Sequence, residues 1–130
     1  NNILTWVVNS LHKGQPITVV SDQFRMPTFS HDLASGILTI AQRKHRGVFH
    51  LCGEDYLSVY EFACRIAKHY DLNESLIRPV STAWLKEKNP RPAKTGFSLL
   101  KSRAVLNYTP TGLDESLNRI PLAQITSLNL

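Results

Sequence analysis

The chain has 130 residues, 42% of them apolar, and its formal net charge is +5. One domain of this length buries roughly two thirds of its unfolded surface, and the composition excludes a disordered chain. No apolar run approaches the ~20 residues that a membrane helix needs, and no secretory signal opens the chain, so we expect a cytoplasmic protein. Because residue 1 is Asn rather than Met, we also expect the chain to begin at a cut or at an internal boundary.

Hydrophobic periodicity in the first half predicts helices that alternate with short strands. Asn2 is suited to cap a first helix, and the β-branched run at residues 17–20 is typical of a strand. A second helix is predicted after the loop that contains Pro27, because apolar residues then return at helical spacing. A second strand is expected at residues 48–52, where an apolar run lies between two glycines.

The second half contains the strongest helix signal. Ser58 and Glu61 have the spacing of a capping box, and the apolar period that follows predicts a helix through about residue 70. Residues 76–80 are expected to form a short edge segment, since a proline there removes a hydrogen-bond donor. Two short helices are predicted to begin near Ser98 and Thr111, and no element is predicted after Pro121.

Few features of the sequence indicate a metal, redox or ligand-binding site by themselves. Cys52 and Cys64 have no metal or redox spacing and are expected to be reduced thiols, and the five histidines are scattered. No metal site is therefore predicted. The basic residues gather at residues 43–46 and 86–103, which is typical either of a solvated surface or of a site for a polyanion.

Four segments, in the same order, resemble the dTDP-4-dehydrorhamnose reductase branch of the extended short-chain dehydrogenases/reductases. Residues 22–34 are similar to its D-Q-x-x-x-P-T…D-[LV]-A segment, and residues 47–53 to its G-x-[FY]-H-x-x-[GS] segment. Residues 77–82 are similar to its I-x-P-V-x-T segment, and residues 91–98 to its R-P-x-x-x-x-L-x segment. The likeness runs from Asn2 to about Ile120, which in that family is the C-terminal half of the subunit.

The resemblance implies an α/β fold: a small C-terminal substrate-binding lobe of an extended Rossmann-type reductase, with short strands and four or five helices. Residues 1–120 would form the sugar-nucleotide-binding lobe and residues 121–130 a C-terminal tail. The parent enzyme would reduce a nucleotide-activated 4-keto-6-deoxy sugar with NADP or NAD. The glycines here lack G-x-x-G or G-x-G spacing, and no Tyr-x-x-x-Lys is present, so we expect neither cofactor binding nor hydride transfer from these residues alone. A missing N-terminal Rossmann lobe would supply both, and without it the fragment is expected to expose an apolar face and to form a homo-oligomer through it.

Five substrate-binding residues are predicted, and no catalytic, cofactor-binding or metal-binding residue: Arg25, Arg91, Asn2, Gln23 and Thr28. The guanidinium groups of Arg25 and Arg91 would grip a diphosphate. The alternative for Arg25 is an ion pair with Asp22 or Asp32, and the alternative for Arg91 is a solvated charge. The remaining three would contact the nucleotide or sugar, or else cap a helix and satisfy loop backbone.

Both tryptophans, Trp6 and Trp84, are expected to pack in the core rather than to stack on a nucleobase.

Other functions stay open at this point. Arg25 replaces a glycine found in many rhamnose-pathway reductases, and it is more similar to the regulatory β subunit of methionine adenosyltransferase, a non-catalytic partner-binding module. An arginine seven residues before the helix Asp is also similar to UDP-galactose 4-epimerase, so a nucleotide-sugar epimerase or dehydratase fragment is a further alternative. Nucleic-acid binding depends on the net charge alone, and neither a nucleic-acid nor a membrane partner is expected.

Overall fold

A computed structural model of the protein describes residues 2–86, 88–89 and 91–127. Within them, seven α-helices and one short 3-10 turn accompany four short strands, which confirms the predicted α/β class. The expected number of helices, four or five, is too low. In chain order the elements are α1 (Ile3–His12), β1 (Ile17–Val20), β2 (Phe24–Arg25), α2 (Ser30–Gln42), β3 (Leu57–Ser58), α3 (Val59–His69), η1 (Glu74–Leu76), β4 (Ile77–Val80), α4 (Thr82–Leu85), α5 (Leu100–Leu106), α6 (Leu113–Asn118) and α7 (Leu122–Ser127).

The strands form two separate pairs. β1 pairs in parallel with β4, in the register Ile17 to Ile77 and Val20 to Val80. β2 pairs antiparallel with β3, where Phe24 lies opposite Ser58. The carboxyl ends of β1 and β4 therefore lie together, and the loops that follow them meet at the same edge.

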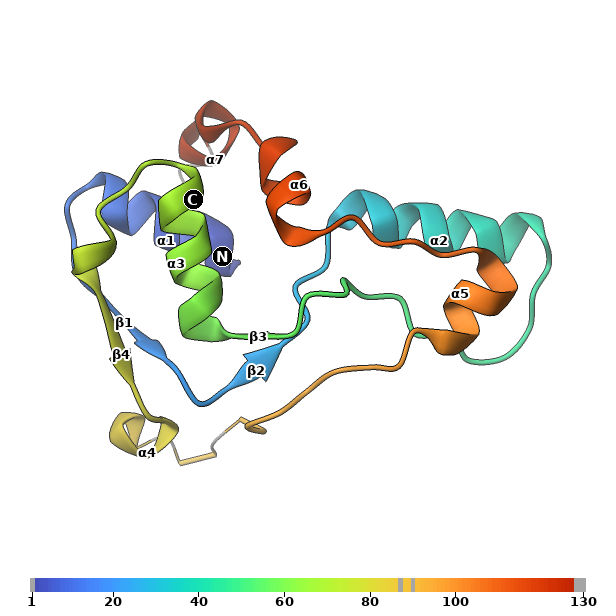
Figure 1. Ribbon diagram of the computed structural model, residues 1–130, viewed down its shortest axis with the longest axis horizontal. Coiled ribbons are helices and arrows are strands. Elements are labelled where there is room, and N and C mark those ends of the chain that lie inside the picture. Colours follow the sequence, from blue (N-terminus) through green and yellow to red (C-terminus); the bar gives the residue numbers. More distant parts are fainter. Residues whose placement is uncertain (1, 87, 90, 128–130) are drawn as a thin grey trace.

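The main hydrophobic core lies between the β1–β4 pair and helices α1 and α3 (Figure 1). Val7 and Val8 on α1 and Ile66 on α3 are fully buried, as the helical spacing predicts. Ile125 on α7 is also buried, because α7 packs against α1. The sequence shows no clear period after Pro121, so α7 was not predicted.

A smaller core lies at the other end of the molecule, where α2 and α5 meet (Figure 1). The strand expected at residues 48–52 is wrong, since this segment pairs with no other strand in the described part of the chain. Its carbonyl groups instead accept hydrogen bonds from side chains. The His50 carbonyl accepts from the Ser102 hydroxyl, and the Cys52 carbonyl accepts from the Tyr108 hydroxyl at 3.2 Å.

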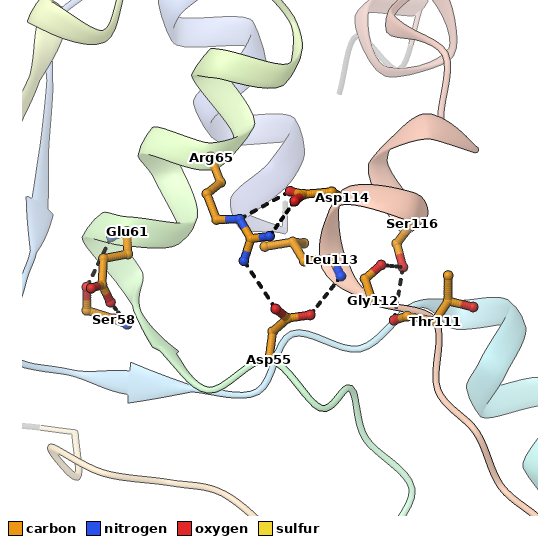
Figure 2. Close-up of polar contacts among 9 residues, drawn as sticks. All are labelled: Asp55, Ser58, Glu61, Arg65, Thr111, Gly112, Leu113, Asp114 and Ser116. Carbon is orange, nitrogen blue, oxygen red and sulfur yellow. Dashed lines mark hydrogen bonds and ion pairs between the residues drawn. The ribbon is translucent and has the colours of Figure 1, made fainter.

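The predicted caps fix the ends of two helices. The side-chain oxygen of Asn2 accepts from the Thr5 amide at 2.9 Å. The Ser58 hydroxyl accepts from the Glu61 amide at 3.0 Å, and the Glu61 carboxylate accepts from the Ser58 amide at 2.7 Å, which confirms the capping box (Figure 2). Both caps satisfy amides that the first turn of a helix leaves unpaired.

An ion-pair network joins α3, α6 and the loop before β3. Figure 2 shows the Arg65 guanidinium between the carboxylates of Asp55 and Asp114. Arg65 donates to Asp55 at 3.1 Å and to Asp114 at 2.6 and 3.1 Å. The second oxygen of Asp55 accepts from the Leu113 amide at 2.7 Å and so fixes the start of α6.

Candidate functional site

A groove of about 340 Å³ lies between the start of α1 and the carboxyl end of β1. Ligands of open α/β sheets bind beyond the carboxyl ends of parallel strands, where the connecting loops diverge. Three of the five predicted substrate residues line this groove: Asn2, Gln23 and Arg91. They come from three distant parts of the sequence, so the fold rather than local sequence brings them together.

The groove combines polar groups with apolar walls. Apolar side chains from α1, β1, α3 and α4 supply most of its lining: Ile3, Trp6, Val19, Val20, Val59 and Leu85. Such a mixture, mostly apolar with a few polar groups that fix orientation, is typical of small-molecule sites.

The two tryptophans are more exposed than the sequence predicts. Trp6 is 38% exposed and lines the groove, and Trp84 is 61% exposed. The prediction that both tryptophans pack in the core is therefore wrong.

Asn2 has two roles in this geometry. Its Oδ1 atom accepts from the amide and the hydroxyl of Thr5, at 2.9 and 3.1 Å, and thereby caps α1. These bonds engage the oxygen of the side-chain amide and not its nitrogen. Helix capping and a ligand contact are thus compatible for this residue.

Arg25 forms no ion pair within the described residues. Asp22 instead binds Thr82, and Asp32 binds Thr111, so neither predicted acidic partner contacts the guanidinium. Arg25 donates to the Phe24 carbonyl at 2.6 Å and to the side chain of Gln23 at 2.9 Å. The ion-pair alternative is therefore wrong, and Arg25 lies one hydrogen bond from a residue of the groove.

The loop that contains Arg91 runs beside β2. The Phe24 amide donates to the Ala93 carbonyl at 2.7 Å, and the Thr95 amide donates to the Phe24 carbonyl at 3.2 Å. Both predicted arginines therefore belong to one region of the molecule. Arg91 is exposed and lines the groove, whereas Arg25 is half-buried and does not line it.

Thr28 lies apart from the groove. Its hydroxyl donates to the Met26 carbonyl and accepts from the Gly53 amide, both at 3.2 Å. It lines a second, mostly apolar pocket of about 310 Å³, which it shares with Asn2. These bonds give Thr28 the loop-supporting role that the sequence offered as its alternative.

Sequence reasoning did not single out Thr82. Its hydroxyl accepts from Gln23 Nε2 at 3.0 Å and donates to Asp22 Oδ1 at 2.7 Å. The hydroxyl and the backbone amide of Thr82 lower the pKa of the Asp22 carboxyl below its usual range. Thr82 ends the I-x-P-V-x-T segment. No local pattern predicts its contacts, because its partners lie on the loop after β1, far away in the sequence.

Other classes of site receive little support from the structure. No group of three or more His, Cys, Asp or Glu residues in the described ranges could hold a metal ion. Cys52 and Cys64 are free thiols, and burial raises the pKa of each. Among the helices of residues 2–86, 88–89 and 91–127, none has the length and apolar character to cross a membrane.

Comparison with known proteins supports the resemblance seen in the sequence. Residues 1–124 match the family described as the RmlD substrate binding domain. The spore coat polysaccharide biosynthesis protein SpsK of Bacillus subtilis is 32% identical over 105 residues, which cover 81% of this chain and 35% of that protein. Methionine adenosyltransferase 2 subunit beta of Mus musculus is 32% identical over 103 residues, covering 73% of this chain and 31% of that protein.

A solved structure agrees with this assignment. Bacillus anthracis dTDP-4-dehydrorhamnose reductase in complex with NADP superposes with a TM-score of 0.84 and 25% identity. The match covers 92% of this chain and 42% of that one. The predicted resemblance is thereby confirmed, and the chain spans less than half the length of each of these relatives.

Proposed function

Since the chain belongs to the RmlD substrate binding domain family, we propose that it binds a nucleotide-activated 4-keto-6-deoxy sugar for an NAD(P)-dependent reductase. The observation that carries this proposal is the groove at the carboxyl end of β1, where Asn2, Gln23 and Arg91 converge. A cation, two amide side chains and an exposed indole together suit a ligand with a phosphate, hydroxyl groups and a planar ring.

The arginines would neutralise the diphosphate of this ligand. Arg91 lines the groove directly. Arg25 does not line it but donates a hydrogen bond to Gln23, which does. A guanidinium binds two phosphate oxygens at once, and each charge-assisted contact contributes roughly 1.5–3 kcal/mol. Asn2 would then orient hydroxyl or carbonyl groups of the sugar or base, whereas Gln23, whose amide already binds Arg25 and Thr82, would act through Arg25.

The residues of this sequence do not fit a dinucleotide cofactor. A pyrophosphate needs a Gly-rich turn at a helix start, and the glycines here are too far apart to form one. We therefore assign no step of hydride transfer to this chain. In the proposal, NADP and the Tyr/Lys pair belong to a Rossmann lobe formed by residues outside this sequence.

Exposed apolar side chains on α2 support the proposal that a further lobe or subunit packs against this helix. Leu33, Ile37 and Leu38 are 39%, 53% and 57% exposed. Large exposed apolar side chains that gather on one helix mark an interaction surface. We propose that this surface faces the cofactor lobe or a second copy of the protein.

The test is calorimetric titration of the protein, at its full natural length, with dTDP. We expect Arg91→Ala and Arg25→Ala each to weaken binding about tenfold or more, the equivalent of ~1.4 kcal/mol. Arg43→Ala is the matched control, because Arg43 is an exposed arginine at the end of α2, away from the groove. Unchanged affinity in both the Arg91→Ala and the Arg25→Ala variant would contradict the proposal.

A second function is a non-catalytic, partner-binding role. The relative that favours it is Methionine adenosyltransferase 2 subunit beta, at 32% identity over 103 residues. The two functions differ in a simple assay with the full-length protein. Consumption of NADPH in the presence of dTDP-4-dehydrorhamnose supports the reductase, whereas tight binding to a methionine adenosyltransferase without NADPH turnover supports the regulatory role.

A further inference from the structure

The buried side chain of Gln23 joins Arg25 to Thr82. Gln23 is only 3% exposed, although its side chain is polar. Its Oε1 atom accepts from the Arg25 guanidinium at 2.9 Å, and its Nε2 atom donates to the Thr82 hydroxyl at 3.0 Å. Both ends of the amide are therefore engaged, as a buried amide requires.

The chain of hydrogen bonds continues to a charged group. The Thr82 hydroxyl donates to Asp22 Oδ1 at 2.7 Å, and the Thr82 amide donates to both carboxylate oxygens at 2.9 Å. Because the hydroxyl donates to Asp22, it presents its lone pair to Gln23, which fixes the orientation of the Gln23 amide. The amide oxygen must then point toward Arg25.

Two parts of the backbone anchor this chain. The Gln23 carbonyl accepts from the Val59 amide at 2.9 Å, at the start of α3. Thr82 lies in the first turn of α4, directly after β4. The orientation of Arg25 is therefore set by the loops after both parallel strands.

We propose that Gln23 and Thr82 are positioning residues, which hold the Arg25 guanidinium beside the groove, ready for an anionic ligand that extends past Gln23. This inference rests on the proposed function. A free arginine side chain loses rotamer entropy when a ligand fixes it, and a side chain that is already fixed avoids part of that cost on binding. The two bonds to Gln23 and Phe24 leave further N–H groups of the guanidinium for a ligand.

The test measures dTDP affinity by calorimetry in single and double variants of the full-length protein. Thr82→Val removes the hydroxyl at nearly constant volume and is expected to weaken binding about three- to tenfold. Thr82→Ser keeps the hydroxyl and restores affinity to within about twofold. In the Arg25→Ala background, Thr82→Val is expected to have no additional effect, since residues that act through one another are not additive.

Several outcomes would overturn the inference. Equal losses from Thr82→Val with and without Arg25 would show that Thr82 acts independently of the guanidinium. Tight binding by Thr82→Val, together with weak binding by Arg25→Ala, would remove the positioning role and leave the proposed function intact. Unchanged binding by Arg25→Ala overturns the positioning role, and unchanged binding by Arg91→Ala as well contradicts the proposed function.

A second variant keeps the test decisive if Thr82→Val does not fold. Gln23→Met keeps the volume of the side chain and removes both of its hydrogen bonds. Thermal unfolding first establishes that the variant is folded. The same loss of affinity, absent in the Arg25→Ala background, is then expected.

Discussion

The carboxylate of Asp32 binds both the amide and the hydroxyl of Thr111, at 2.7 and 2.9 Å, although the two residues are 79 positions apart. Asp32 lies in the first turn of α2, and Thr111 lies just before α6. The sequence suggested Asp32 as an ion-pair partner of Arg25, but its contacts are structural. They tie the segment that leads into α6 to the helix after the Arg25 loop.

Replacing Asp32 should therefore lower stability. We expect Asp32→Ala to lower the free energy of unfolding by about 1–3 kcal/mol, because the half-buried Thr111 amide and hydroxyl both lose their acceptor. Urea denaturation measures this change. Glu115→Ala is the matched control, since Glu115 is exposed and forms an i,i+4 pair with Arg119, and its cost should stay below about 1 kcal/mol. Equal costs for the two variants would contradict the role given to Asp32.

A side chain at Gly53 should separate two loops. A Cβ atom built at Gly53 would lie 1.9 Å from the Pro27 carbonyl oxygen, a backbone atom that side-chain rotation cannot move. We expect Gly53→Ala to cost about 2–4 kcal/mol of stability, measured by thermal or urea unfolding. At Gly112 the nearest atom to such a Cβ is 4.0 Å away, so Gly112→Ala should cost less than about 1 kcal/mol. The prediction fails if the two variants unfold alike.

The capping box should contribute measurably to the stability of α3. Ser58 is 3% exposed, and its hydroxyl caps the Glu61 amide. Ser58→Ala is expected to lower the free energy of unfolding by about 1 kcal/mol. Ser35→Ala, at an exposed position inside α2, serves as the control and should change it by less than about 0.5 kcal/mol. A Ser58→Ala protein as stable as the wild type would rule out this contribution.

Tyr108 should make stability depend on alkaline pH. Burial, followed by the charges of Asp32 and Cys52, raises the pKa of Tyr108 to about 12. In the unfolded chain the phenol ionises near pH 10, so folding keeps a proton that the unfolded state releases. This contribution is complete below about pH 10 and is lost as the pH rises toward 12, which amounts to about 2–3 kcal/mol.

Unfolding curves at pH 8 and pH 11 measure the loss. Tyr108→Phe should be less stable at pH 8, because the bond to the Cys52 carbonyl is gone, and its stability should fall less steeply toward pH 11. Burial also raises the pKa of Tyr70, which remains in this variant, so a part of the alkaline dependence should persist. An identical slope in both proteins would contradict the prediction.

Local signals in the sequence predicted five of the helices, α1, α2, α3, α5 and α6, but neither α4 nor α7. The caps at Asn2 and Ser58 need only a side chain and an amide three residues away, and the structure confirms both. The run of β-branched residues at Ile17–Val20 likewise marked β1. The order of the family segments identified the family and its fold class.

The candidate site was predicted only in part. Asn2, Gln23 and Arg91 do line one groove, but Thr28 lies in another pocket, and Arg25 reaches the groove only through Gln23. Whether any of the five contacts a ligand stays a prediction. Thr82 was noted only as the end of a family segment, and the fold makes it the partner of Gln23.

By itself, the sequence determined the capped helices, because their hydrogen bonds join residues within one helical turn. The order of its segments also determined the family. The tertiary structure decided which strands pair, and it left residues 48–52 without a strand partner in the described ranges. It also decided which groups the side chains of Asp22, Asp32 and Arg25 contact. The physical reason is that strand pairing and side-chain networks join residues some 60 to 80 positions apart, as in Asp22 with Thr82 and Asp32 with Thr111, and no local pattern encodes such partners.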